Sequence, residues 1–239
     1  MFLKTVNRAR VRLALCLILL MTTLTGTVAF AGENRTAKVR MAPEDCKYFE
    51  VQVNNCTLMI EPADDTQPEV HFDTGALRIQ QSVNGETLCL TIESHTGKVM
   101  GFDAAATLYV PRSLFNALMM KTLNGELMLM GGIASMQDIT ADNSRVSVQY
   151  TGSAKGYSMS LSASTCDFSV PDTATDYRII MNTHKGAGGN YSLPGDETWL
   201  IRTDGRHQYP MRGGEGEGNV SVDLMNNSNF NVRFSRTAN

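Results

Sequence analysis

Short runs in which apolar and polar residues alternate make up most of this chain beyond its first thirty residues. A period of two places every second side chain on one face, which is the pattern of a half-buried β-strand. Gly, Asn, Asp and Ser separate the runs, as turns require, and no window repeats apolar residues at helical spacing over three turns. We therefore predict an all-β protein. The runs are centred on Val51, Leu90, Leu108, Val148, Val170, Val222 and Val232.

Three eight-residue segments superimpose without gaps: residues 122–129, 141–148 and 163–170. Their starts lie 19 and 22 residues apart (141 − 122 and 163 − 141), and a fourth copy covers residues 225–232. A repeat of about twenty residues is typical of one coil of a β-solenoid. We therefore predict a β-solenoid, a single-stranded β-helix-like fold with rungs of about twenty residues. A β-sandwich is the alternative, because short alternating strands of any all-β protein can be aligned in this way.

Stacking the copies predicts which side chains become neighbours. The two inward columns would be Leu127–Val146–Phe168 and Leu129–Val148–Val170. The turn column would be Asn124–Asn143–Thr165. The outward column would be Glu126–Arg145–Asp167. Opposite charges would then meet on successive rungs of the outward column, which stabilises cross-strand pairs modestly.

The first residues have the composition of an export signal. Four basic residues without an acid precede an apolar run over residues 13–21, and Ala29-Phe30-Ala31 ends the segment with small residues at the required spacing. We expect cleavage between Ala31 and Gly32, which gives a signal peptide over 1–31, a polar linker over 32–45 and a single domain over 46–239. An uncleaved membrane anchor is the alternative, because no charge lies between Arg12 and Glu33.

Net charge limits the partners. After cleavage the chain keeps 17 of its 21 basic residues and all 24 acidic ones, a net charge of −7. A mildly acidic surface without a basic run argues against nucleic acid and anionic lipid as partners. Membrane contact is expected only through an uncleaved leader.

Four cysteines remain after cleavage: Cys46, Cys56, Cys89 and Cys166. An even number in an exported chain permits disulfides, with three full pairings open. Cys46 and Cys56 flank one short strand, so they are the favoured pair, and four free thiols are the alternative. No C-x-x-C spacing occurs, which removes the usual zinc-ribbon and thioredoxin motifs.

Motifs that carry chemistry are missing from the sequence. The four histidines are isolated from one another and from cysteines at ligand spacing, so we predict no metal site. The glycine-rich stretches 186–189 and 213–218 have neither phosphate-binding spacing nor a following helix, so we expect loops and no cofactor. Trp199 is interpreted as a core or cap residue, with a sugar-stacking platform as the minority reading. We therefore assign no catalytic residue.

Parts of the chain resemble a known family. The segment 109–118, which contains Val110-Pro111, and the following Lys121-Thr-Leu-Asn-Gly-Glu-Leu-Met-Leu129 are similar to the bacterial "putative adhesin" domains. Residues 218–232 resemble that family's closing rung, and 49–53 with 56–60 its opening strands. The resemblance implies an exported, β-helix-like domain of the cell envelope without catalytic residues, in a family with some members at envelope-stress loci. This chain departs from the family at Asn143-Ser144 and Thr165-Cys166, where Asn-Gly is usual.

These observations predict a non-enzymatic, exported cell-envelope protein: an adhesin, or an envelope-binding or stress-associated module. Its partner would be a cell-wall polymer or an envelope or membrane protein. The alternative is a secreted polysaccharide-active enzyme on a β-helix scaffold, which would need two converging carboxylates. In the expected register Arg145 lies between Glu126 and Asp167. We therefore expect the two carboxylates to form ion pairs with Arg145 rather than to act together in catalysis.

Overall fold

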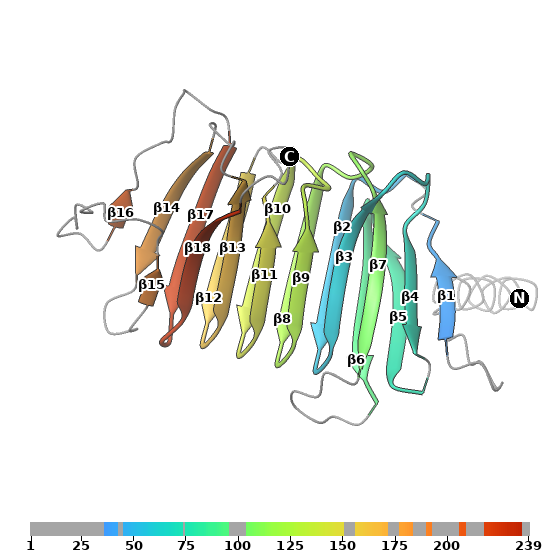
Figure 1. The fold of residues 1–239 in the computed structure, drawn as a ribbon. Helices are drawn as coiled ribbons and strands as arrows, with labels where there is room; N and C mark the ends of the chain where they lie inside the picture. The colour runs from blue at the N-terminus through green and yellow to red at the C-terminus, as the bar shows by residue number, and fades with distance from the viewer. Residues whose placement is uncertain are drawn as a thin grey trace, which may run out of the picture.

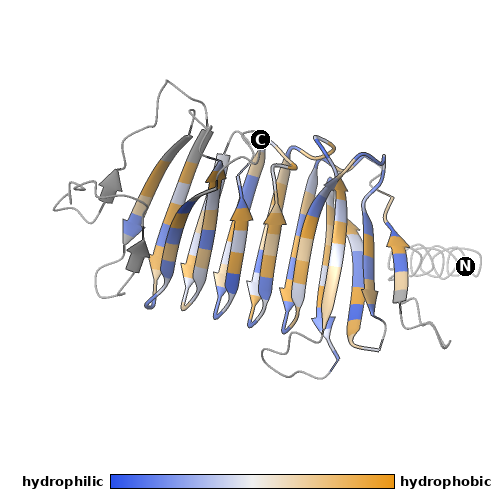
Figure 2. Ribbon diagram, in the orientation of Figure 1, coloured by the Kyte–Doolittle hydropathy of each residue, from blue (hydrophilic) through white to orange (hydrophobic). Residues whose placement is uncertain are grey.

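The computed structural model describes residues 36–42, 45–73, 75–95, 104–150, 156–171, 177–183, 190–192, 206–208 and 218–235. Every regular element in these ranges is a β-strand, so the all-β prediction is confirmed. A search of the same residues finds no helix with the length and apolar character to cross a membrane. Figure 2 shows why the chain forms strands: orange and blue positions alternate along the coloured strands, so these strands have one apolar and one polar face.

The strands form two nine-stranded sheets, whose arrangement is seen in Figure 1. The first sheet has the order β1 (Thr36–Arg40), β4 (Glu69–Asp73), β7 (Ala105–Pro111), β3 (Thr57–Ala63), β9 (Glu126–Met130), β11 (Arg145–Gln149), β13 (Thr165–Pro171), β18 (Asn229–Ser235) and β15 (Asn190–Ser192). The second has the order β16 (Arg206–Gln208), β14 (Tyr177–Thr183), β17 (Gly218–Met225), β12 (Gly156–Ser162), β10 (Met136–Asp142), β8 (Ala117–Leu123), β2 (Tyr48–Asn54), β6 (Thr87–Ser94) and β5 (Leu77–Asn84).

Five pairs of strands repeat one unit, which we call a rung: a strand of the second sheet, a tight turn, and a strand of the first sheet. The rungs are β2–β3, β8–β9, β10–β11, β12–β13 and β17–β18. Neighbouring rungs pair in parallel and in register, and their inward side chains belong to a single buried core. The molecule thus has two layers, as a sandwich does, while its central strands are stacked in parallel coils.

The expected register holds for two copies of the repeat and is wrong for the third. Val146 is the partner of Leu127, as predicted, but its other neighbour is Cys166. Phe168 lies two residues further along, beside Val148, and packs against Phe230 with ring centroids 5.9 Å apart. The tight turn that precedes this strand lies at Ala163 and Ser164, two residues before the expected turn position at Thr165.

The order of the rungs in space reveals two inserted segments. The chain leaves the stack between β3 and β8 (residues 64–116), and again between β13 and β17 (residues 172–217). The first insertion places β6 and β7 beside β2 and β3; the second places β14 and β15 beside β17 and β18. The last strand of the chain, β18, is therefore internal, between β13 and β15 (Figure 1). Both insertions cover ends of the five-rung stack.

Two expectations for the amino-terminal region need correction. Residues 36–40, expected in a polar linker, form β1 and pair antiparallel with β4. The expected disulfide between Cys46 and Cys56 is not formed: none of Cys46, Cys56, Cys89 and Cys166 is in a disulfide. The seven-residue strand β2 separates the two residues by about 23 Å, whereas a disulfide requires Cα atoms within about 7 Å. The expected cleavage site at Ala31 and Gly32 lies outside the described residues.

Candidate functional site

The tight turns of the five rungs line up along one edge of the molecule (Figure 1). Each turn contains a residue in the left-handed conformation. These residues are Asn55 (φ 56°), Asn124 (φ 51°), Asn143 (φ 47°), Ala163 (φ 47°) and Asn227 (φ 62°). Asparagine tolerates this conformation better than most residues, which explains why four of the five turns carry it. The turn column therefore contains Ala163 where we expected Thr165.

Buried serines join the turns to one another. The Ser144 amide donates to the Ser164 hydroxyl (3.0 Å), the Ser164 amide to the Ser228 hydroxyl (3.2 Å), and the Gly125 amide to the Ser144 hydroxyl (3.2 Å). Each hydroxyl in turn donates to a carbonyl of its own turn, as Ser144 does to Asp142 at 2.7 Å. A buried amide left without a partner is costly, so this ladder holds successive turns in register. The alternation of apolar and polar residues along the sequence does not predict the hydrogen bonds of these serines.

A groove of about 210 Å³ runs along this turn edge, on the side of the first sheet. Polar groups from four rungs line it, and the Asn143 side-chain amide donates to the Asn124 carbonyl oxygen at 2.7 Å. The lining residues are Asn55, Cys56, Thr57, Asn124, Gly125, Glu126, Asn143, Ser144, Arg145, Ala163 and Thr165. Because it crosses the rungs, the groove presents similar polar groups repeatedly, about 4.8 Å apart.

Two charged side chains of the groove have no charged partner within the described residues. Glu126 and Arg145 are partners in the β9–β11 ladder, yet no ion pair joins their side chains. The expected pairing of Arg145 with Asp167 is also wrong, because Asp167 accepts from Arg233 (3.2 Å) and Asn231 (3.1 Å). Exposed ion pairs contribute little to stability, so nothing in folding forces Glu126 and Arg145 together. Both charges are free to contact a ligand.

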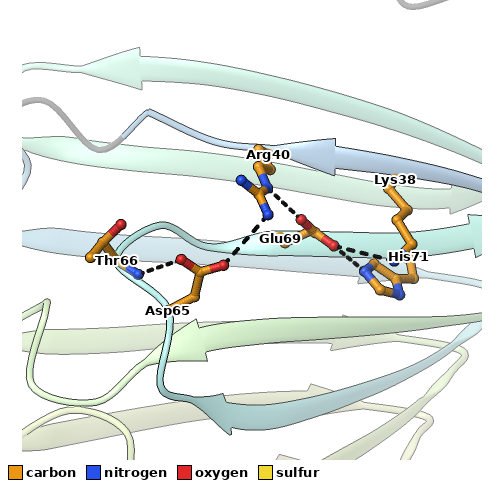
Figure 3. A network of polar contacts seen from close by, with 6 residues as sticks. All are labelled: Lys38, Arg40, Asp65, Thr66, Glu69 and His71. Carbon is orange, nitrogen blue, oxygen red and sulfur yellow. Dashed lines mark hydrogen bonds and ion pairs between the residues drawn. The ribbon is translucent and has the colours of Figure 1, made fainter.

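A second polar cluster, drawn in Figure 3, serves the fold instead. Glu69 on β4 accepts from Arg40 on β1 (2.7 Å) and from His71, and Lys38 on β1 lies 3.8 Å away. The hydrogen bond from Arg40, followed by that from His71, lowers the pKa of Glu69 to about 2. Arg40 also reaches Asp65 at 3.6 Å. This network ties the outermost strand of the first sheet to its neighbour.

The described residues contain no group of three or more metal-binding side chains of the His, Cys, Asp and Glu types. Burial raises the pKa of the Cys56 thiol to about 11, and that of Cys166 is raised as well, so neither has the thiolate character of a nucleophile. Glu126 on β9 and Asp167 on β13 are separated by strand β11 and by two positions in the register, and Asp167 is held by Arg233. His184 and Trp199 lie outside the described residues.

Comparison with known proteins relates the chain to others through its fold. No family model matches the sequence, and neither does any curated protein. A solved structure named a "putative cell adhesion protein", from Clostridium sporogenes, is similar with a TM-score of 0.51 and 9% identity over 84% of this chain and 99% of that one. A "putative adhesin" from Bacteroides fragilis matches with a TM-score of 0.36 and 10% identity over 86% of this chain and all of that one. The first likeness shows a shared fold.

Proposed function

We propose that this chain is a non-enzymatic, adhesin-like binding protein of the cell envelope, which holds an extended cell-wall polymer in the groove along its turn edge. The observation that carries the proposal is the groove itself: it crosses four rungs and contains the unpaired charges of Glu126 and Arg145. A groove that repeats with the rungs suits a long ligand with repeating units. The likeness in fold to a protein named for cell adhesion supports the same reading.

The polar groups of the groove favour a hydroxyl- or amide-bearing chain such as a glycan. Asn55 has no side-chain partner among the described residues, and Asn124 and Asn143 use only one donor and one acceptor on each other. Each asparagine amide can both donate and accept, as binding to sugar hydroxyls or N-acetyl groups requires. The leader expected over residues 1–31 would bring the domain to that polymer.

Catalysis is not part of this proposal. A polysaccharide hydrolase needs two carboxyl groups converging on the scissile bond. In the groove Glu126 is the sole carboxylate among the lining residues, and Asp167 is engaged by Arg233 and Asn231 outside it. A stress-associated protein that acts through a partner protein would also be located in the cell envelope. The sedimentation experiment below distinguishes this role from polymer binding.

The test is sedimentation with isolated envelopes of the source organism. Purified protein is incubated with the envelopes, the fraction in the pellet is measured, and the supernatant is scanned for released oligosaccharides by mass spectrometry. We expect the protein in the pellet with no released fragments. The double variant Glu126→Gln, Arg145→Gln should bind roughly 30- to 100-fold more weakly, because each change replaces a charged hydrogen bond of about 1.5–3 kcal/mol by a neutral one of about 0.5–1.5 kcal/mol.

A matched control exists on the second sheet. Lys47, just before β2, and Glu86, just before β6, are exposed at the ends of these strands opposite the turn edge, so Lys47→Gln with Glu86→Gln removes the same two charges away from the groove. This control should bind as the unaltered protein does. Equal binding by both double variants would remove the groove from the proposal, released oligosaccharides would establish the enzyme, and protein left in solution would favour a partner protein.

A further inference from the structure

Three methionines lie together on the solvent-facing side of the first sheet, in a group we call the methionine patch: Met59 of β3 with Met128 and Met130 of β9. Met130 is 39% exposed, and Met59 and Met128 are half-buried. The residues that alternate with them, such as Leu58 and Leu127, point into the core and are fully buried. The patch therefore belongs to the outer face of the sheet.

The methionines of the patch are out of place on this face. In the column that contains Met59 and Met128, the residues of the other strands are polar: Lys38, His71, Thr107, Ser147, Asp167 and Asn231. Methionine usually fills gaps in a core, as Met120, Met159 and Met181 do in this protein with at most 1% exposure. Core packing does not explain three thioethers that face water beside polar neighbours.

The register places the three methionines at neighbouring positions on one face. Met59 and Met128 are direct partners in the parallel β3–β9 ladder, where strands lie about 4.8 Å apart. Met130 follows Met128 by two residues on the same face, about 6.7 Å along the strand. Each side chain has three rotatable bonds before its methyl group, so the three sulfurs can converge above the sheet.

Acidic residues flank the patch. Glu61 follows Met59 and Glu126 precedes Met128 by two residues each, which places both on the same outer face. Neither carboxylate is in an ion pair with another described residue. Arg145 is the ladder partner of Glu126, so it is the Glu61 carboxylate, on the neighbouring strand β3, that raises the local concentration of cations beside the thioethers.

We propose that the methionine patch is a binding site for a soft monovalent cation, Cu(I), held by the three thioether sulfurs. Thioethers are soft ligands that select Cu(I) over hard ions such as Ca²⁺ and Mg²⁺. Cysteine, histidine and carboxylate ligands must be deprotonated before they bind a metal, whereas a thioether sulfur has no proton to lose. Binding to the patch is therefore independent of pH between 5 and 8. The three thioethers do not line the polymer groove, although Glu126 borders both, and the proposal does not depend on the proposed function.

The experiment uses Ag⁺ as a redox-stable probe and Cu(I) kept reduced by ascorbate without oxygen. Because thiols also bind these ions, every protein carries Cys16→Ser and Cys89→Ser. Cys89 is half-exposed, while Cys46, Cys56 and Cys166 are buried. Methionine methyl groups labelled with ¹³C are followed by NMR during titration, and Cu(I) affinity is measured by competition with bicinchoninate. The variants are Met59→Leu, Met128→Leu, Met130→Leu and the triple change.

We expect the methyl signals of Met59, Met128 and Met130 to shift together with one equivalent of Ag⁺, while the buried Met120 and Met159 signals stay unchanged. Replacing outer-shell partners already costs metal sites about 10–100-fold in affinity, so each leucine variant should bind Cu(I) at least about tenfold more weakly. Met136→Leu, on the second sheet and 49% exposed, is the matched control and should bind normally.

Three results would overturn the proposal. The first is unchanged Cu(I) affinity in the triple leucine variant, and the second is the absence of any shift of the three methyl signals at one equivalent of Ag⁺. The third is affinity that rises steeply from pH 5 to pH 8, which would assign the ion to protonatable ligands. Leucine keeps the apolar character of the patch, so a surface that docks an apolar partner would survive the triple change while the metal site would not.

Discussion

At the scale of single residues, Gly125 follows the left-handed Asn124, at the position where the next three rungs carry Ser144, Ser164 and Ser228. A Cβ atom at this position would lie 2.6 Å from the Cys56 carbonyl oxygen and 3.2 Å from the Thr122 hydroxyl. We predict that Gly125→Ala lowers the free energy of unfolding by about 1–3 kcal/mol, the usual cost of overpacking, in urea titrations followed by circular dichroism.

A second turn substitution gives the matched comparison. Ala163 has φ 47°, a conformation that costs an L-residue about 1–2 kcal/mol and glycine nothing. Glycine loses about 0.5–1 kcal/mol more conformational entropy on folding. Ala163→Gly should therefore leave stability unchanged or raise it by up to about 1 kcal/mol. A Gly125→Ala protein as stable as the unaltered one would show that the Cys56 backbone can move aside.

The turn residues also explain why the register of the third repeat is predicted wrongly from the sequence. Asn124 and Asn143 predict their turns from sequence, because asparagine tolerates the left-handed conformation and is common in turns. Ala163 has no such signal, so a gap-free alignment set Thr165 and Cys166 in the turn and moved Phe168 by one inward position. The serine ladder and the groove depend on turns brought together in space, and alternation along one strand contains no information about them.

At the scale of elements, strand β1 is held to β4 by the network around Glu69 (Figure 3). The pKa of Glu69 is lowered from 4.5 to about 2, so the folded state favours the ionised carboxylate. A depressed pKa contributes stability above pH 4.5, and this contribution is lost as the pH falls toward 2. We predict that the stability difference between the unaltered protein and Glu69→Gln shrinks as the pH falls below about 4.5.

The measurements are urea titrations from pH 7 to 2.5 and hydrogen exchange of the β1 amides. Glu69→Gln should speed exchange in β1 at pH 7, because an edge strand with fewer ties opens locally. Glu86→Gln is the matched control: its carboxylate pairs with Lys47, and both side chains are more than half exposed, so little should change. A stability difference that stays constant down to pH 2.5 would contradict the assignment of the network.

At the scale of the whole molecule, the sequence predicts strands well and their order in space poorly. Repeats over 122–148 lie in successive rungs, and their register follows directly from the alignment. The rung β17–β18 is separated from β12–β13 by 46 residues, and β8–β9 from β2–β3 by 53, so neither contact follows from spacing. Such contacts are fixed by which exposed edge each returning strand can cover, a property of the assembled sheets.

Without residues 172–217, the last four rungs would follow one another directly along the chain. Strand β13 already lies beside β18, and β12 beside β17, so a five-residue connection like the one between β9 and β10 can join β13 to β17. We predict that a protein with such a linker in place of 172–217 keeps a β-type circular dichroism spectrum and unfolds cooperatively. Loss of β14 and β15, however, exposes the edges of β17 and β18.

Exposed parallel edges pair with other chains, so the shortened protein should self-associate as concentration rises, measured by size-exclusion chromatography with light scattering. A lysine at an outward position of β17, Ser221→Lys, should reduce this association, because charges on an edge strand oppose pairing. The same substitution in the full-length protein should leave its association state unchanged, since β14 covers that edge. A shortened protein that stays monomeric at all concentrations would show that 172–217 is not a cap, and one that fails to fold would make this segment part of the core.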